Sequence, residues 1–158
     1  QDARLTLTQQ PSNYYDVIIG DVFHDITVPY HLITREYLAL VKGRLKSNGI
    51  YMMNLVDGYP DPRLLKSVYR TLKSEFREVH IYLEKIPDQA TRHTYVIIAG
   101  DIFQPLPMIK PELSVTRKWY NITSQILDNG TPINKLPLLT DDFSPVDRLL
   151  HKVLLKIE

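Results

Sequence analysis

The sequence predicts an α/β fold, and three observations support this prediction. Residues 17–19 are consecutive β-branched side chains, which is typical of a strand that is covered on both faces of a parallel sheet. Helix-like and strand-like periodicities then alternate along residues 31–76. Two later strands, near 79–84 and 94–99, are separated by a loop too short for a crossover helix, so this pair is expected to be antiparallel.

The first third of the chain supplies two strands and two helices. A short helix within 2–10 precedes the strand at 15–20, and a polar loop at 21–30 follows that strand. A longer helix is expected over 31–46, because apolar residues recur there at helical spacing and an Asn-Gly pair marks its end. A strand over 50–55 comes next.

The middle of the chain continues this alternation. Asp61 and Pro62 are expected to start a helix, the first as its cap and the second in its first turn. The strand at 79–84 alternates apolar with polar residues, which predicts a half-exposed strand near an edge of the sheet. Residues 94–99 are apolar throughout and predict a central strand.

The C-terminal part is irregular at first and then helical. Val115, Trp119, Ile122 and Ile126 recur at helical spacing and predict one amphipathic helix. A last helix is expected to begin at Ser144, which is followed by proline and, two residues further on, by an acid.

Composition excludes several classes of function. The formal net charge of +1 gives no reason to expect a nucleic acid or an anionic membrane as a partner. No apolar run approaches the ~20 residues that a membrane span needs, and the absence of cysteine excludes disulfides and thiol chemistry. The chain begins with Gln1 and shows no signal peptide, so we expect a processed product or an excised piece.

Several kinds of site are missing from the sequence. It contains no Gly-rich nucleotide loop, no nucleophile elbow and no clustered metal ligands, so no metal is predicted. The histidines are scattered and are interpreted as surface or packing residues; they are His24, His31, His80, His93 and His151.

Asp21 is the candidate functional residue that the residue pattern itself indicates. It follows Gly20 at the expected exit of the strand at 15–20, and ligands of open α/β sheets bind outside the carboxyl ends of the strands. Position alone leaves a second interpretation open, in which Asp21 is a loop acid or a helix cap.

Four stretches of the sequence resemble one known family. Residues 2–4 and 15–21 resemble the paired GDAR and YDVIIxD motifs of the spermidine synthase family. Residues 28–36 and 139–146 resemble its spermidine synthase-like branch, whose members are often bacterial and sometimes fused to membrane segments. The resemblance covers nearly the whole chain.

The resemblance implies a fold and a domain boundary. The family has the Rossmann-like fold of class I S-adenosylmethionine-dependent methyltransferases, a mostly parallel sheet with one antiparallel strand. Residues 1–158 would then be a single incomplete domain, its C-terminal part, because the family's Gly-rich nucleotide loop precedes these motifs. Residues 101–158 would be a C-terminal extension that packs on the sheet.

An incomplete sheet implies a partner for its open edge. The strand at 15–20 would expose an unpaired apolar edge. The expected protein partner is therefore the remainder of the same polypeptide or a second copy of the chain in a homodimer. The expected location is cytoplasmic, either as a free protein or as the soluble part of a membrane-fused one.

The resemblance also implies a reaction. The family transfers an aminopropyl group from decarboxylated S-adenosylmethionine to a small amine, without a metal. Asp21 matches the catalytic acid, which binds the ammonium group of the acceptor and takes its proton. Asp2 and Ala3 match the segment that contacts the adenine of the adenosyl nucleoside, where a carboxylate accepts from the exocyclic amine. The co-substrate is decarboxylated S-adenosylmethionine or S-adenosylmethionine.

One departure from the family bears on the acceptor. Spermidine synthases carry a second Asp three positions after the catalytic one, and this chain has His24 there, followed by Asp25. A histidine does not supply a constant negative charge to an ammonium group. Tyr30, Asp141 and Asp142 are further candidates for the acceptor pocket, although the two acids also suit capping ahead of the last helix.

Three hypotheses follow from the sequence. The first is an aminopropyltransferase-like enzyme with Asp21 as its general base. The second is a methyltransferase-fold relative that binds an adenosyl ligand and uses a different acceptor. The third is a non-catalytic interaction domain that has kept the fold.

Overall fold

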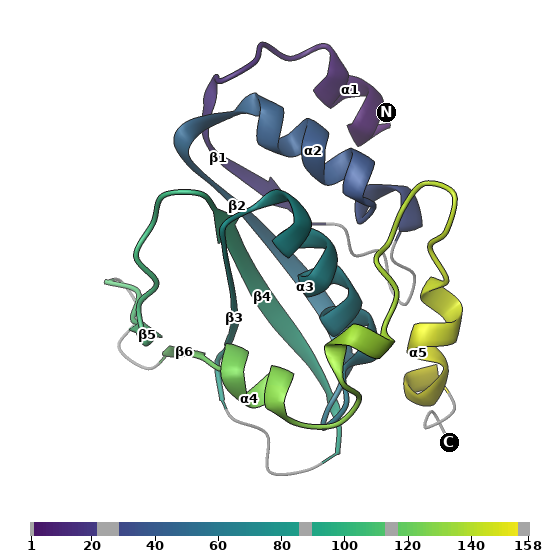
Figure 1. Ribbon diagram of the computed structural model, residues 1–158. Helices are drawn as coiled ribbons and strands as arrows, with labels where there is room; N and C mark the ends of the chain where they lie inside the picture. Colours follow the sequence, from purple (N-terminus) through teal and green to yellow (C-terminus); the bar gives the residue numbers. More distant parts are fainter. Residues whose placement is uncertain (1, 22–28, 86–89, 113–116, 155–158) are drawn as a thin grey trace.

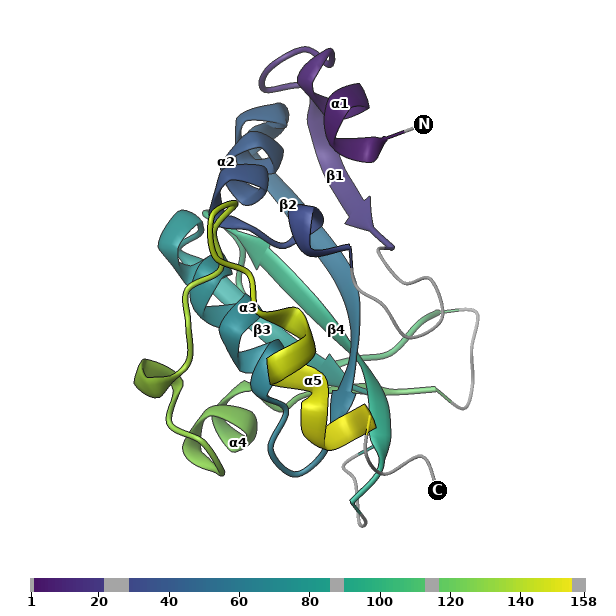
Figure 2. The same cartoon turned by 90° about the vertical axis from the view of Figure 1, so that its right-hand side faces the viewer.

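The computed structural model describes residues 2–21, 29–85, 90–112 and 117–154, with side chains as far as residue 150. The described part has two layers, a sheet and a set of helices packed on one of its faces (Figures 1 and 2). The strands are β1 (Tyr15–Gly20), β2 (Leu45–Gly58), β3 (Glu78–Leu83), β4 (Arg92–Gly100), β5 (Met108–Ile109) and β6 (Trp119–Asn121). The helices are α1 (Ala3–Thr8), α2 (Arg35–Arg44), α3 (Arg63–Glu75), α4 (Thr123–Asp128) and α5 (Val146–Leu154), with two 3-10 turns, η1 (Tyr30–Leu32) and η2 (Ile133–Lys135).

The strand order in the sheet is β1-β2-β4-β3-β6-β5. β1 and β2 are parallel, and the other neighbouring pairs are antiparallel. Because β2 and β3 both run against β4, the strands β1, β2 and β3 share one direction and β4 is the reversed strand among these four. The predicted position of the 94–99 strand, between the 50–55 and 79–84 strands, is confirmed. The parallel character predicted for the sheet therefore holds for the direction of β1, β2 and β3, while the reversed strands β4 and β6 make four of the five neighbouring pairs antiparallel.

The helix expected over 31–46 is divided into η1 and α2. Thr34 separates the two, and its Oγ1 accepts a hydrogen bond from the Tyr37 backbone N–H at 3.4 Å, which caps α2. The chain turns directly from Arg44 into β2 at Leu45, so this strand begins several residues before its predicted start. No helix in the described ranges combines the length and the apolar character that crossing a bilayer requires.

The core lies between the sheet and helix α3. The apolar stripe of α3 is fully buried at Leu64, Leu65, Val68 and Leu72, as the helical spacing predicts. These side chains face the sheet layer, in which alternate residues of β2 are buried on the helix-covered side. α5 also packs against α3 and β2, so the last described helix closes the same layer.

A buried lysine closes the corner between α3 and the segment after α4. Lys66 has no exposed side-chain surface, and its Nζ donates to the backbone carbonyls of Asn129 and Thr131, the latter at 3.0 Å. The carboxylate of Asp61 lies 3.3 Å from the same nitrogen and also accepts from the Thr131 N–H and hydroxyl, at 2.8 and 2.6 Å. Asp61 therefore binds this segment and does not cap α3 as expected.

The region around β6 differs from its sequence prediction. The helix expected from Val115 to Ile126 is instead strand β6 followed by the short helix α4, and Val115 lies outside the described residues. Since β6 pairs with β3, the strand β3 is not at the edge of the sheet, and Tyr82 is 1% exposed where a half-exposed side chain is predicted. Apolar spacing alone did not separate one helix from a strand and a helical turn.

β1 is the edge strand of the described sheet, as the incomplete-domain interpretation predicts. Val17 and Ile19 pair in register with residues on the face of β2 that the helices do not cover, and they are 45% and 70% exposed. The prediction that 15–20 is a strand buried on both faces is therefore wrong for the described chain. Only Gly20 of this strand is buried.

Gly20 is buried because the ring of Tyr51 lies directly behind it. A Cβ atom added at Gly20 would lie 3.0 Å from Tyr51 Cζ and would overlap the phenolic oxygen, so the glycine makes room for this ring. Tyr51 is itself fully buried in β2. Asp21 is the next residue along the chain, so this contact lies under the backbone that carries the candidate acid.

We expect Gly20→Ala to destabilise the fold by about 1–3 kcal/mol through overpacking against Tyr51. The matched control is Gly43→Ala in α2, where no atom lies within 4 Å of the new Cβ and the change should stabilise by about 0.5–1 kcal/mol. Denaturant unfolding measures both. Tyr51→Phe, which removes the overlapping oxygen, should recover part of the loss in the double variant; equal losses with and without that oxygen would contradict the contact.

Candidate functional site

Asp21 lies immediately beyond the carboxyl end of β1, and its side chain is exposed. Its Oδ1 accepts a hydrogen bond from Asn54 Nδ2 on the neighbouring strand β2 at 3.5 Å. No cation pairs with this carboxylate among the described residues. Asp21 therefore keeps accessible lone pairs at the edge of the sheet where α/β proteins bind ligands. The predicted site residues His24 and Asp25 lie outside the described residues.

Asp2 and Ala3 begin helix α1. The Asp2 carboxylate is the cap of this helix and accepts from the backbone N–H groups of Arg4 at 2.8 Å and Leu5 at 3.4 Å. A negative charge at this end also complements the helix dipole. Both Asp2 and Ala3 are exposed, so the predicted nucleoside segment is an accessible helix start held in a defined conformation.

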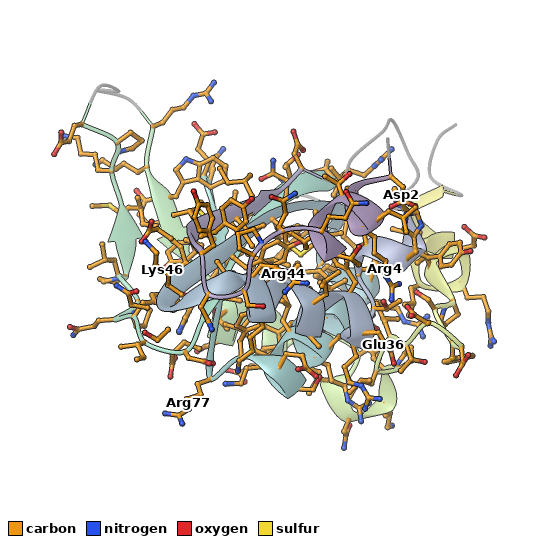
Figure 3. All side chains as sticks on the ribbon, turned by 90° about the horizontal axis from the view of Figure 1, so that it is seen from above. Asp2, Arg4, Glu36, Arg44, Lys46 and Arg77 are labelled. Atoms are coloured by element: carbon orange, nitrogen blue, oxygen red, sulfur yellow. The ribbon has the colours of Figure 1, made fainter. Side chains whose placement is uncertain are left out.

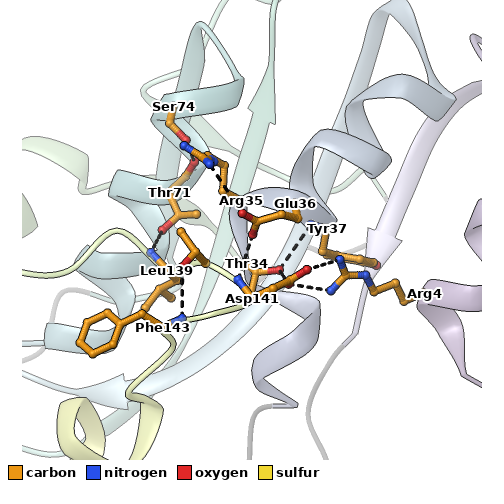
Figure 4. Close-up of polar contacts among 11 residues, drawn as sticks. Arg4, Thr34, Arg35, Glu36, Tyr37, Thr71, Ser74, Leu139, Asp141 and Phe143 are labelled. Carbon is orange, nitrogen blue, oxygen red and sulfur yellow. Dashed lines mark hydrogen bonds and ion pairs between the residues drawn. The ribbon is translucent and has the colours of Figure 1, made fainter.

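Asp141 forms an ion pair with Arg4, which is distant in the sequence. Arg4 Nη1 and Nη2 bind the two carboxylate oxygens of Asp141 at 2.7 and 2.6 Å (Figure 4). The Thr34 hydroxyl donates to Asp141 Oδ1 at 2.7 Å, and the Asp141 backbone N–H donates to Glu36 Oε2 at 3.0 Å. The hydrogen bonds from Arg4 and Thr34 lower the pKa of Asp141 to about 2, so this carboxylate is charged at neutral pH.

Tyr30 lines a cavity of about 490 Å³ between η1 and the start of α5. Its wall is apolar at Pro29, Val146 and Leu150, and it carries one carboxylate, from Asp147, and one guanidinium, from Arg148. Tyr30 is 58% exposed, so the ring is accessible from this cavity. Asp142, the other predicted acid, is exposed, and no residue of the predicted site other than Tyr30 lines the cavity in the described part.

A larger hollow of about 830 Å³ lies elsewhere, between the β3–β4 hairpin and β6. Its lining includes Arg92, Lys118 and Trp119 and none of the described residues predicted for the site. Size alone therefore does not select the functional site. The smaller cavity is the one that a predicted site residue, Tyr30, lines.

The structure brings part of the predicted site together. Arg4 Nη1 also donates to the His31 carbonyl in η1 at 3.3 Å, so one guanidinium joins the start of α1, the turn that carries Tyr30 and the segment of Asp141.

Sequence reasoning missed Asp57, the last acid of β2. It is fully buried, and its carboxylate accepts from the backbone N–H groups of Gly58 at 2.7 Å and Leu65 at 2.9 Å, which caps the first turn of α3 from the strand. Burial raises the pKa of Asp57 to about 7, and these backbone hydrogen bonds only partly oppose the rise. An acid at the end of an otherwise apolar strand, directly before glycine, was the available signal.

Asp57 should make stability depend on pH. Its folded-state pKa is raised above the ordinary value of 3.8, so between about pH 4 and pH 7 the folded protein holds a proton that the unfolded chain releases. The free energy of unfolding should therefore fall as pH rises through this window, by an amount on the order of a few kcal/mol. Asp57→Asn should flatten this slope, and the exposed Asp142→Asn should leave it unchanged. Denaturant unfolding at several pH values measures the slope; an equal slope in Asp57→Asn would contradict a protonated carboxyl.

The fold is that of the class I S-adenosylmethionine-dependent methyltransferases, and Asp21 lies just beyond the carboxyl end of its strand β1. The structure is similar to a probable spermidine synthase from Corynebacterium glutamicum, with a TM-score of 0.62 and 18% identity over 87% of this chain and 55% of that chain. It is also similar to human methyltransferase-like protein 13 in complex with SAH, with a TM-score of 0.50 and 20% identity over 100% of this chain and 59% of that one.

Sequence comparison finds relatives that are described as polyamine aminopropyltransferases. The chain is 22% identical over 158 residues to the probable polyamine aminopropyl transferase of Bifidobacterium longum. This alignment covers 88% of this chain and 35% of that protein. This match confirms the relationship to the spermidine synthase-like family that the motifs predict. No family model matches the chain. The chain spans less than half the length of the curated relatives it matches.

Proposed function

We propose that this protein transfers an aminopropyl group from decarboxylated S-adenosylmethionine to an amine, with Asp21 as the general base. The observation that carries the proposal is an exposed carboxylate without a cationic partner in the described part, directly beyond the carboxyl end of β1. The relatives described as polyamine aminopropyltransferases support the type of reaction. The SAH bound to methyltransferase-like protein 13 supports an adenosyl ligand for this fold.

The chemistry explains why a carboxylate is needed. The bond that breaks joins carbon to a positively charged sulfur, and the leaving group is neutral methylthioadenosine, which needs no acid. The bond that forms joins the same carbon to the amine nitrogen. An alkylamine with a pKa near ~10 is protonated at neutral pH and cannot attack. Asp21 would bind the ammonium group, accept one of its protons and release the lone pair for attack.

The proposal assigns the remaining predicted residues to two subsites. Asp2 and Ala3 would contact the adenosyl group at the exposed start of α1. The cavity at Tyr30 would hold the methylene chain of the acceptor against its apolar wall, with Asp147 near a distant ammonium group. His24 and Asp25 belong to the same proposed acceptor site.

A second candidate is an adenosyl-dependent transferase with another acceptor. The observation that favours it is His24 at the position where spermidine synthases carry their second Asp. Loss of that fixed negative charge weakens the recognition of a diamine without removing the proposed base. An acceptor panel therefore distinguishes the two candidates.

Asp21→Asn in the full-length protein should lower the rate of aminopropyl transfer by about 10²–10⁴-fold, because the amide is isosteric but cannot take a proton. Adenosyl affinity should barely change. The matched control is Asp16→Asn in the same strand, an exposed acid paired with Lys46 at 2.8 Å, whose loss should leave the rate within a few-fold. The assay is transfer to putrescine and to a panel of other amines, with nucleoside binding by calorimetry.

Two results would count against the proposal. Turnover by Asp21→Asn within a few-fold of the unmodified protein would remove Asp21 from the chemistry. An absence of turnover with every amine, together with binding of S-adenosylmethionine, would favour the second candidate.

Asp2→Asn should have the opposite profile and weaken adenosyl binding first, because an amide oxygen is a poorer acceptor than a carboxylate for the exocyclic amine of adenine. Asparagine caps helices as well as aspartate does, so α1 should persist. Calorimetric titration with decarboxylated S-adenosylmethionine, S-adenosylmethionine and methylthioadenosine measures the effect; an unchanged affinity for all three would exclude the assigned contact.

A further inference from the structure

Helix α1 cannot be held in place by packing alone. It has six residues, and none of them is buried. Only Leu7 of α1 packs, half-buried, against the core. Short helices that bury so little apolar surface are marginal in water, so the position of α1 must also come from other contacts. Arginines fix both of its ends: Arg4 near its start, and Arg44, which donates to the carbonyls of Leu7 and Thr8 at 3.0 Å each, near its end. Figure 3 shows Arg4 and Glu36 toward one end of α2, and Arg44 and Lys46 toward the other.

Arg4 differs from Arg44 in what it joins. Arg44, at the end of α2, joins that helix to the end of α1 and to the segment just after it, including the Ser12 hydroxyl at 2.8 Å. Arg4 binds three segments that are far apart in the sequence: α1, η1 through the His31 carbonyl, and the turn of Asp141. We call Arg4, Thr34 and Asp141, with their mutual hydrogen bonds, the Arg4 junction (Figure 4).

The turn around Asp141 connects the Arg4 junction to the start of α5, which lines the cavity at Tyr30. Thr140 and Phe143 exchange two backbone hydrogen bonds, of 3.0 and 3.1 Å, which close the turn around Asp141. Three residues beyond this turn α5 begins, and its first residues line the cavity. Just before the turn, Leu139 is fixed separately by its N–H to the Thr71 hydroxyl at 3.0 Å. The Leu139 carbonyl also accepts from the Arg35 backbone N–H at 2.9 Å, so the segment is joined to the start of α2 at Leu139. Its connection to η1 runs through Asp141 and Arg4.

Resting on the proposed function, we propose that Arg4 and Asp141 are positioning residues, which hold the nucleoside segment and the acceptor cavity in one arrangement. Asp2 and Ala3 lie on one side of the junction, and Tyr30 with the start of α5 lies on the other. Misplacement of reacting groups by about 1 Å can cost ~10²-fold in rate, so a rigid connection between the two subsites matters for transfer.

Asp141 acts in this proposal through Arg4 and not by binding the amine. Both of its carboxylate oxygens accept from the guanidinium fork, and one accepts from the Thr34 hydroxyl as well. An ammonium group would have to displace a bidentate cation, which is among the stronger pairings that a carboxylate makes. The sequence-based assignment of Asp141 to the acceptor pocket is thus replaced by a role one contact away from it.

The test compares Arg4→Lys and Asp141→Asn with Arg44→Lys in the full-length protein. Lysine keeps the charge of arginine but loses the fork that binds two partners at once. Hydrogen–deuterium exchange should become at least about tenfold faster at 30–36 and at 139–143 in the first two variants. Arg44→Lys, the matched control, should change exchange only in and after α1. This readout needs no enzymatic activity.

The kinetic arm separates positioning from direct binding. Arg4→Lys and Asp141→Asn should each raise the KM for the best acceptor about tenfold, for monoamines and diamines alike, and the double variant should be no worse than either single variant. If Asp141 bound the ammonium group directly, Arg4→Lys would release it and would leave KM unchanged or lower.

The outcomes separate this inference from the proposed function. Faster exchange confined to 2–8, or an unchanged acceptor KM in Arg4→Lys, would overturn the positioning role. Absence of turnover by the unmodified protein, with exchange altered as expected, would reject the proposed reaction and the catalytic part of this inference, and would retain the junction as a structural connection.

Discussion

The pairing of β2 with β4 is the interaction on which the rest of the structure depends. The two strands run antiparallel over nine residue pairs, from Ile50 opposite Gly100 to Gly58 opposite Arg92. β2 carries β1 on its other edge, and β4 carries β3, so the remaining strands are attached through this pair. The candidate acid, the buried Asp57 and the residues under α3 all take their positions from β2. A change in its register by one residue would move Asp57 and the β2 residues under α3 to the opposite face.

The sequence predicted β1, β3, β4 and the central part of β2, because each of these has a clear apolar pattern. It did not predict β5, β6 or the early start of β2. It also failed where two structures share one pattern: Trp119, Ile122 and Ile126 satisfy helical spacing, but the pairing of β6 with β3 and β5 places Trp119 in a strand, opposite Ile109. It also treated 15–20 as a fully buried strand, because β-branched runs carry no information on which neighbours are present. Burial is a property of the assembled layers, and Val17 and Ile19 are exposed where those layers end.

The candidate site divides in the same way. Asp21 could be predicted, because a strand followed by glycine and an acid is a local pattern. The contact between Arg4 and Asp141 could not, since 137 positions separate them and nothing in either neighbourhood specifies the other. Asp57 was missed for a different reason: its environment is created by α3 folding over the end of β2, and the sequence shows only an acid before a glycine. The position of an acid after a strand could be predicted from neighbouring residues, whereas pairing between distant residues could be seen only in the folded structure.

The burial of Lys66 allows local opening between α3 and the segment after α4 to be measured by chemical modification. An amine that is fully enclosed and donates to two carbonyls and a carboxylate cannot react with an acylating compound until the segment after α4 lifts away from α3. The acylation rate of Lys66, relative to that of exposed lysines such as Lys118, would therefore record how often this corner opens. The modification of this one side chain would therefore measure local opening without an engineered label.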